Sequence, residues 1–104
     1  TGVLKAEALY HKAYFQYQAK DYEASNKTVQ QLAADFASYK KWGIKGLLLM
    51  ASNNEKLGDF FQATYILESL IANYKAYPEM VKEAQKLLRA VREKETAQSE
   101  ATIN

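Results

Sequence analysis

The residues whose types are suited to catalysis or metal binding are few and do not form a site. His11 is the only histidine of the chain, and there is no cysteine. The lack of cysteine excludes thiol catalysis and cysteine-ligated zinc. The neighbours of His11 at helical spacing form no set of metal ligands: Glu7, Ala8, Tyr14 and Phe15. We therefore expect His11 to be an ordinary surface or boundary histidine.

A pair of carboxylates is the second candidate for chemistry. Glu79 and Glu83 lie one helical turn apart, but Lys82 and Lys86 alternate with them. Interleaved charges of this kind are typical of a solvent-exposed helix face, where each ion pair contributes about 0.2–0.5 kcal/mol. The sequence also contains no glycine-rich loop that would hold a phosphate. We therefore expect no catalytic residues, no cofactor and no metal, and we predict that the protein is not an enzyme.

The composition is that of one small helical domain. The chain has 104 residues, of which 48% are apolar and 25% charged, with a net charge of +2. One proline and four glycines are too few for a turn-rich all-β fold. The longest strongly apolar stretch, residues 46–51, is far shorter than the ~20 residues of a membrane-spanning helix. We expect no direct insertion into a membrane.

Apolar residues recur at spacings of three and four in five successive runs, which is the pattern of amphipathic helices. In the first run, for example, Ala6, Leu9 and Ala13 share one helix face. The sequence therefore predicts one all-α domain over residues 1–96, followed by a frayed or disordered tail at 97–104. The predicted helices are residues 3–19, 22–37, 41–57, 60–75 and 78–96.

An internal repeat relates the first two pairs of helices. The breaks at Lys20-Asp21-Tyr22 and Gly58-Asp59-Phe60 are alike and lie 38 residues apart. A shift by this interval superposes residues of the same kind: Leu9 on Leu47, Ala13 on Ala51, Ser25 on Ala63, Val29 on Leu67 and Leu32 on Leu70. The chain is thus predicted to hold two copies of a helix-turn-helix unit, followed by one extra helix.

These residues resemble the tetratricopeptide repeat (TPR) family. The resemblance rests on the small residues Ala13 and Ala51, the Gly58-Asp59-Phe60 turn, Ala63, Leu67 and Leu70. It implies a right-handed stack of antiparallel helix pairs, an α-α superhelix. In this arrangement repeat 1 spans about residues 6–39, repeat 2 about 44–77, and a C-terminal capping helix about 78–96.

The second copy fits the resemblance better than the first. Residues 42–74 look like repeats of large Gram-negative bacterial TPR proteins, which are commonly exported and attached to the cell envelope. The resemblance alone therefore suggests the cell envelope or periplasm, and the cytoplasm stays open. In the first copy Lys20 replaces the turn glycine and Ser25 replaces the small alanine, while Lys12 and Gln16 occupy positions expected to be apolar.

A candidate concave groove follows from the spacing of the tyrosines and from the resemblance. Glu7, Tyr10, Tyr14 and Tyr17 form one stripe beside the core stripe of the first helix. In TPR proteins this face of the first helix lines a groove that receives peptide partners. The candidate groove therefore comprises this stripe and its equivalents in the second copy: Glu7, Tyr10, Tyr14, Tyr17, Lys45, Leu48, Ser52 and Glu55. Alternatively, the tyrosines pack on each other or on a preceding repeat. Trp42 and Tyr74 are assigned to the core.

The two ends of the domain are predicted to differ. The first helix carries apolar and aromatic residues on more than one side: Val3, Leu4, Leu9, Tyr10, Tyr14, Phe15 and Tyr17. The last helix is polar on its outer side, as a terminal capping helix needs to be. We therefore expect the C-terminal side to be a cap, and the N-terminal helix to dock onto an upstream repeat or a second copy of the chain. The start at Thr1, without an initiator methionine, likewise suggests a fragment of a longer protein.

The functional expectation is a non-catalytic TPR scaffold that binds a protein or peptide partner. The main alternative is a purely structural cap or self-association segment of a longer repeat array. Nucleic-acid binding is a third and weaker alternative. Lys82, Lys86 and Arg89 form a basic stripe, but acidic residues interleave with it and the net charge is small.

Overall fold

The computed structural model describes residues 1–103, and within this range it consists of five helices with no strand. The helices are α1 (Gly2–Gln18), α2 (Tyr22–Asp35), α3 (Lys40–Lys56), α4 (Phe60–Asn73) and α5 (Pro78–Ile103). The predicted all-α class with five helices is confirmed. The bounds of the first four helices lie within two residues of the predicted ones.

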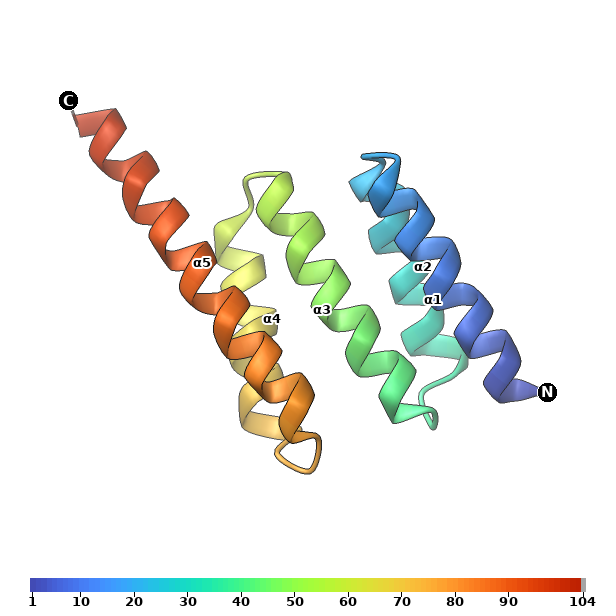
Figure 1. Ribbon diagram of the computed structural model, residues 1–104. Helices are drawn as coiled ribbons and strands as arrows, with labels where there is room; N and C mark the ends of the chain where they lie inside the picture. The colour runs from blue at the N-terminus through green and yellow to red at the C-terminus, as the bar shows by residue number, and fades with distance from the viewer. Residues whose placement is uncertain (104) are drawn as a thin grey trace.

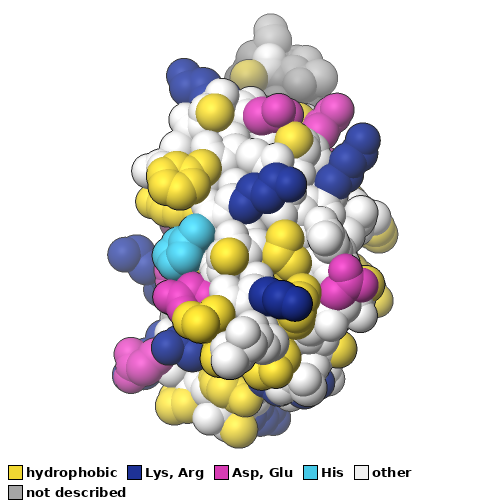
Figure 2. Space-filling view, turned by 90° about the vertical axis from the view of Figure 1, so that its right-hand side faces the viewer, with side chains coloured by type: hydrophobic (Ala, Val, Ile, Leu, Met, Phe, Trp, Pro, Cys, Tyr) yellow, Lys and Arg dark blue, Asp and Glu magenta, His cyan; other side chains and the backbone are white. Residues whose placement is uncertain are grey.

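The helices form two layers. Successive helices run up and down, so that α1, α3 and α5 lie side by side in one layer, with α2 and α4 behind them (Figure 1). The central helix α3 contacts all four others. The α1–α2 end of the molecule is the one seen in Figure 2. No helix in the described range is long and apolar enough to cross a membrane.

The turns after α1 and α3 have the same backbone geometry. Lys20 and Gly58 occupy equivalent positions, and both adopt a left-handed conformation, with φ of 63° and 80°. Next in the chain, Asp21 and Asp59 are the N-caps of α2 and α4. Each carboxylate accepts a hydrogen bond from the amide of the third residue of its helix, at 3.3 Å and 3.1 Å. These caps satisfy amides that have no partner within the helix, which fixes where α2 and α4 begin.

The core is built from equivalent positions of the two copies. Ala13, Val29 and Leu49 form a buried apolar cluster between α1, α2 and α3. A larger cluster joins α3, α4 and α5: Ile44, Leu48, Ala51, Phe60, Ala63, Leu67, Leu70, Ala84, Leu88 and Val91. Because Ala13 and Ala51 are both fully buried, the helices approach closely at the same point of each copy.

The α2–α3 junction contains a buried polar contact that the sequence pattern does not predict. The hydroxyl of Ser25 donates to the carbonyl of Ala13 at 2.7 Å, and Asn53 Nδ2 donates to Ser25 Oγ at 2.8 Å. Asn53 Nδ2 also lies 2.9 Å from Asn26 Oδ1. Ser25 and Asn53 are both fully buried. Ser25 therefore stands in place of the expected alanine with a hydrogen-bonding role of its own.

The predicted end of the last helix at residue 96 is wrong, because α5 continues to Ile103. The segment after Arg92 contains no glycine or proline and is rich in good helix formers such as glutamate, lysine and alanine. The helix therefore continues after its apolar stripe ends, with exposed side chains through Ala101. Residues 97–103 are helical in place of the predicted tail, and Asn104 lies outside the described residues.

Trp42 does not belong to either core cluster, contrary to the prediction. Its ring is half-buried against α1, with centroids 5.6 Å from Tyr10 and 6.1 Å from His11. Trp42 sits in the first turn of α3, on the side that faces α1, and this position explains why it packs there. Tyr74, in contrast, packs against the α3–α4–α5 cluster, as expected.

Candidate binding groove

The layer formed by α1, α3 and α5 borders an open hollow of about 540 Å³. Three helices supply its lining: Tyr10, Tyr14 and Tyr17 from α1; Lys45, Leu48, Leu49 and Ser52 from α3; and Glu83, Lys86, Leu87 and Ala90 from α5. Six of the eight residues predicted from the sequence are among them. We refer to this hollow as the groove.

The register of α1 turns its tyrosines toward the groove. Ala6 and Ala13 are fully buried on the inner side of the helix. The tyrosines lie beside them in one row, with ring centroids 6.4 Å apart for Tyr10 and Tyr14, and 6.1 Å for Tyr14 and Tyr17. Tyr10 and Tyr17 are half-buried and contact the Ala13–Val29–Leu49 cluster, whereas Tyr14 is the most exposed. The row thus lines the groove with three aromatic rings, of which that of Tyr14 is the most exposed.

Lys45 lies at the junction between α1 and α3. Its ammonium nitrogen is 5.3 Å from the ring centroid of Tyr10 and 4.9 Å from that of Trp42. Contacts of this kind between an ammonium group and an aromatic face are each favourable by about 0.5–1 kcal/mol at exposed sites. They hold the ammonium group against the rings of Tyr10 and Trp42, and the Lys45 side chain contributes to the lining of the groove.

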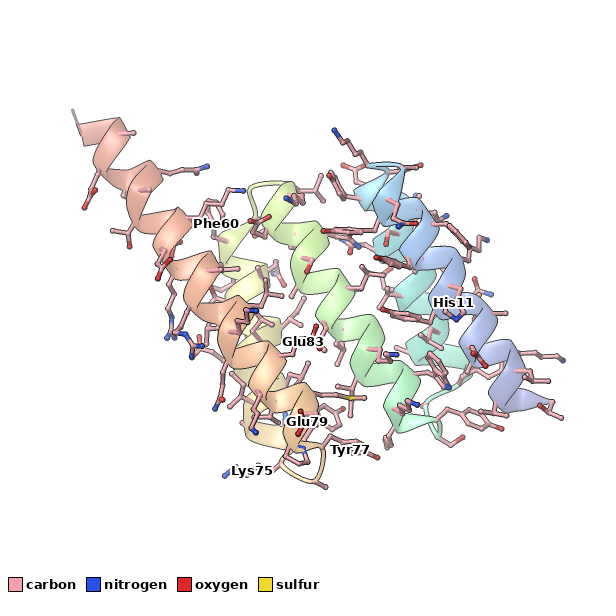
Figure 3. The ribbon with its side chains drawn as sticks, in the orientation of Figure 1. His11, Phe60, Lys75, Tyr77, Glu79 and Glu83 are labelled. Atoms are coloured by element: carbon pink, nitrogen blue, oxygen red, sulfur yellow. The ribbon has the colours of Figure 1, made fainter. Side chains whose placement is uncertain are left out.

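Helix α5 forms the opposite wall and brings charge to it. Glu83 projects from α5 toward α3 (Figure 3), and Lys86 lies one turn further along the helix. The pKa of Tyr10 is raised, first by burial of its hydroxyl and then by the negative potential of Tyr14 and Glu83. The groove therefore combines apolar aromatic surface with cations and a carboxylate within one concave face.

The α5 wall was missed by the sequence analysis, although a signal for it exists. A shift of 38 residues from Lys45, Leu48 and Ser52 leads to Glu83, Lys86 and Ala90, and all three line the groove. The repeat therefore extends into the last helix, which contributes to the groove like α1 and α3. The predicted ion pairs on this helix are not found, since none of Glu79, Lys82, Glu83 and Lys86 is part of a salt bridge among the described residues.

The two remaining predicted residues lie outside the lining of the hollow. Glu7 Oε1 is 3.7 Å from His11 Nε2, one helical turn further along α1. Glu55 Oε1 is 3.0 Å from Lys94 Nζ, a contact that joins α3 to α5. His11 itself is exposed on the surface of α1, as predicted (Figure 3).

The described part of the chain contains no cluster of side chains suited to bind a metal ion. There, no group of three His, Cys, Asp or Glu side chains is arranged to hold a metal ion. Comparison with known proteins adds no assignment, since the chain matches no protein-family model, no curated protein and no solved structure. The groove is thus the candidate functional site of the described residues.

Proposed function

We propose that the protein is a non-catalytic, TPR-like scaffold that binds a segment of a partner protein in the groove between α1, α3 and α5. One observation carries the proposal: three helices related by the same 38-residue shift all contribute side chains to one hollow of about 540 Å³. This volume lies within the range of about 300–1,000 Å³ typical of ligand sites. A helix-pair stack of right-handed, TPR-like form accounts for this arrangement.

The lining indicates the chemistry of the bound segment. Tyr10, Tyr14 and Tyr17 offer rings for apolar or aromatic side chains, and tyrosine is enriched in protein interfaces because it combines a large apolar surface with a hydroxyl group. Lys45 and Lys86 offer cations for carboxylates, and Glu83 offers one anion. An extended peptide that alternates apolar and acidic residues matches this set of groups.

Selection from a random peptide display library on the immobilised full chain tests the proposal. The affinity of selected peptides is then measured by calorimetry for wild type, Tyr14→Ala and Tyr65→Ala. Tyr65 is the matched control, because it is an exposed tyrosine on α4 outside the groove. We expect Tyr14→Ala to weaken binding by about tenfold, as loss of one interface anchor does, and Tyr65→Ala to have no effect. Failure to select any peptide, or the reverse order of the variants, contradicts the proposal.

A further inference from the structure

A second surface lies on the exposed side of α1, opposite the buried Ala6 and Ala13. The outer face of α1 is defined by four residues in one row: Leu4, Ala8, His11 and Phe15. Leu4 is 60% exposed and Phe15 is 70% exposed. In Figure 2 hydrophobic side chains lie above and below the single histidine of this face, with charged side chains between them. Within the described range all four residues are exposed, and the one ring contact of the row with another helix is that of His11 with Trp42 of α3.

The same face is covered where the repeat places it on α3. A shift of 38 residues leads from the outer face of α1 to Trp42, Gly46, Leu49 and Asn53. Gly46 and Asn53 of this face contact α2, whereas Trp42 at its end packs against Tyr10 and His11 of α1. A Cβ atom on Gly46 would lie 3.2 Å from side-chain atoms of both Val29 and Leu32, and Asn53 donates its hydrogen bond to Ser25. Gly46, Leu49 and Asn53 are all buried by this contact.

The same face is covered again on α5. A second shift leads to Met80, Ala84, Leu87 and Val91. Ala84 and Val91 are fully buried and belong to the same cluster as Leu67 and Leu70 of α4. In both cases a small residue lies at the centre of the face. The helix that covers it carries a small residue followed, four and seven positions later, by aliphatic ones: Ser25, Val29 and Leu32 in α2, and Ala63, Leu67 and Leu70 in α4.

We propose that the outer face of α1 is the seat of an amphipathic helix from a partner protein, packed there as α2 packs on α3 and α4 on α5. Ala8 takes the central position of Gly46 and Ala84, and Phe15 supplies the main apolar anchor. The partner helix presents a small residue and two aliphatic residues at the spacing given above. Lys5 and Lys12 border the seat, and neither is in an ion pair within the described part of the chain. The partner helix therefore carries carboxylates at its flank.

The probe for this seat is a hydrocarbon-stapled peptide with the sequence of residues 22–35, which has Ser25, Val29 and Leu32 at the required spacing. It is titrated into the full, isotopically labelled chain, and the shifts of the Ala8 and His11 resonances are followed by NMR. The control peptide carries Val29→Asp and Leu32→Asp. Two protein variants are compared: Phe15→Asp in the seat, and Phe61→Asp, which alters a 75% exposed phenylalanine on α4. Because both positions are exposed, we expect both variants to fold.

We expect the probe to shift the Ala8 and His11 resonances and the control peptide to leave them unchanged. Phe15→Asp should weaken binding at least about tenfold, and Phe61→Asp should leave it unchanged. Higher ionic strength should weaken it as well, because it screens Lys5 and Lys12. The proposal is overturned by an absence of shifts, or by shifts centred on Gly46, which would show displacement of α2. A chain dimer in light scattering that Phe15→Asp dissociates would identify a second copy as the occupant and would also overturn it. Groove variants such as Tyr14→Ala should leave this binding intact.

Discussion

The buried polar contact between α2 and α3 allows a stability prediction with a worked magnitude. Asn53 is fully buried and donates two hydrogen bonds through Nδ2, to Ser25 Oγ at 2.8 Å and to Asn26 Oδ1 at 2.9 Å. Asn53→Ala removes both bonds and leaves space in the packed junction. At about 1 kcal/mol for each hydrogen bond, the free energy of unfolding should fall by about 2 kcal/mol, and somewhat more for the space left.

The equivalent junction between α4 and α5 provides a compensating variant. There, Ala63 and Val91 occupy the positions of Ser25 and Asn53, and both are fully buried. Ser25→Ala combined with Asn53→Val copies this apolar junction into the first copy. It also removes Asn53 Oδ1, a buried acceptor with no hydrogen-bond partner. The double variant removes the two fully buried members of the contact and leaves only the half-buried Asn26, so it should lie within about 1 kcal/mol of wild type.

Urea unfolding followed by circular dichroism measures these differences. With a slope near ~2 kcal/mol per molar urea, Asn53→Ala should lower the midpoint by about 1 M at unchanged slope. The double variant should stay close to wild type. If Asn53→Ala unfolds at the wild-type midpoint, or if the double variant is as unstable as Asn53→Ala, the polar contact does not stabilise the junction in the way described.

Three further predictions concern the helix crossing, the turns and the groove. Ala63 of α4 is fully buried where this helix packs against its neighbours. Ala63→Leu should overpack this crossing and lower the free energy of unfolding by ~1–3 kcal/mol in the same urea assay. A variant as stable as wild type would exclude a close helix crossing at this position. Lys20 and Gly58 both have φ in the left-handed region, where glycine is less strained than other residues. Lys20→Gly should therefore stabilise the protein and Gly58→Ala should destabilise it, each by about 1 kcal/mol. Urea midpoints equal to that of wild type would contradict this. The pKa of Tyr10 is higher in the folded protein than in the unfolded chain. The contribution of protonated Tyr10 to the free energy of unfolding is therefore complete below the pKa of an unfolded tyrosine, and it is lost as the pH rises through the pKa of folded Tyr10. Glu83→Gln should lower that pKa in a spectrophotometric titration read as a difference from Tyr10→Phe, and an unchanged titration would show that Glu83 does not act on it.

The elements that local chemistry specifies could be predicted from the sequence. Asp21 and Asp59 are N-caps whose side chains bind helix amides, and the breaks before them mark the ends of α1 and α3. The end of α5 could not be found in the same way. An apolar stripe marks where a helix is buried, whereas its length depends on helix propensity and on the absence of a breaker. Periodicity therefore placed the end at residue 96, although the helix continues to Ile103.

The groove was predictable in part, for a related reason. Helical spacing puts Tyr10 and Tyr14 on one face, and the repeat supplies Lys45 as a neighbour on α3. Helical periodicity shows which residues share a face of a helix, but not which neighbouring helix that face contacts. Trp42 was therefore assigned to the core, although its ring packs on α1. The face with Glu83 was read as solvent-exposed because its charges alternate in sign. Only packing against α3 shows that such a charged face also lines a hollow.

Chemical-shift mapping of the full chain with a peptide selected on it tests the central claim most directly. The account predicts that the shifted amide and side-chain resonances belong to the groove residues of all three helices, with Tyr14, Lys45 and Lys86 among the largest. Saturation should occur at one peptide per chain. Shifts confined to α2 and α4, or a peptide that binds without moving any groove resonance, would contradict the claim that the groove is the binding site.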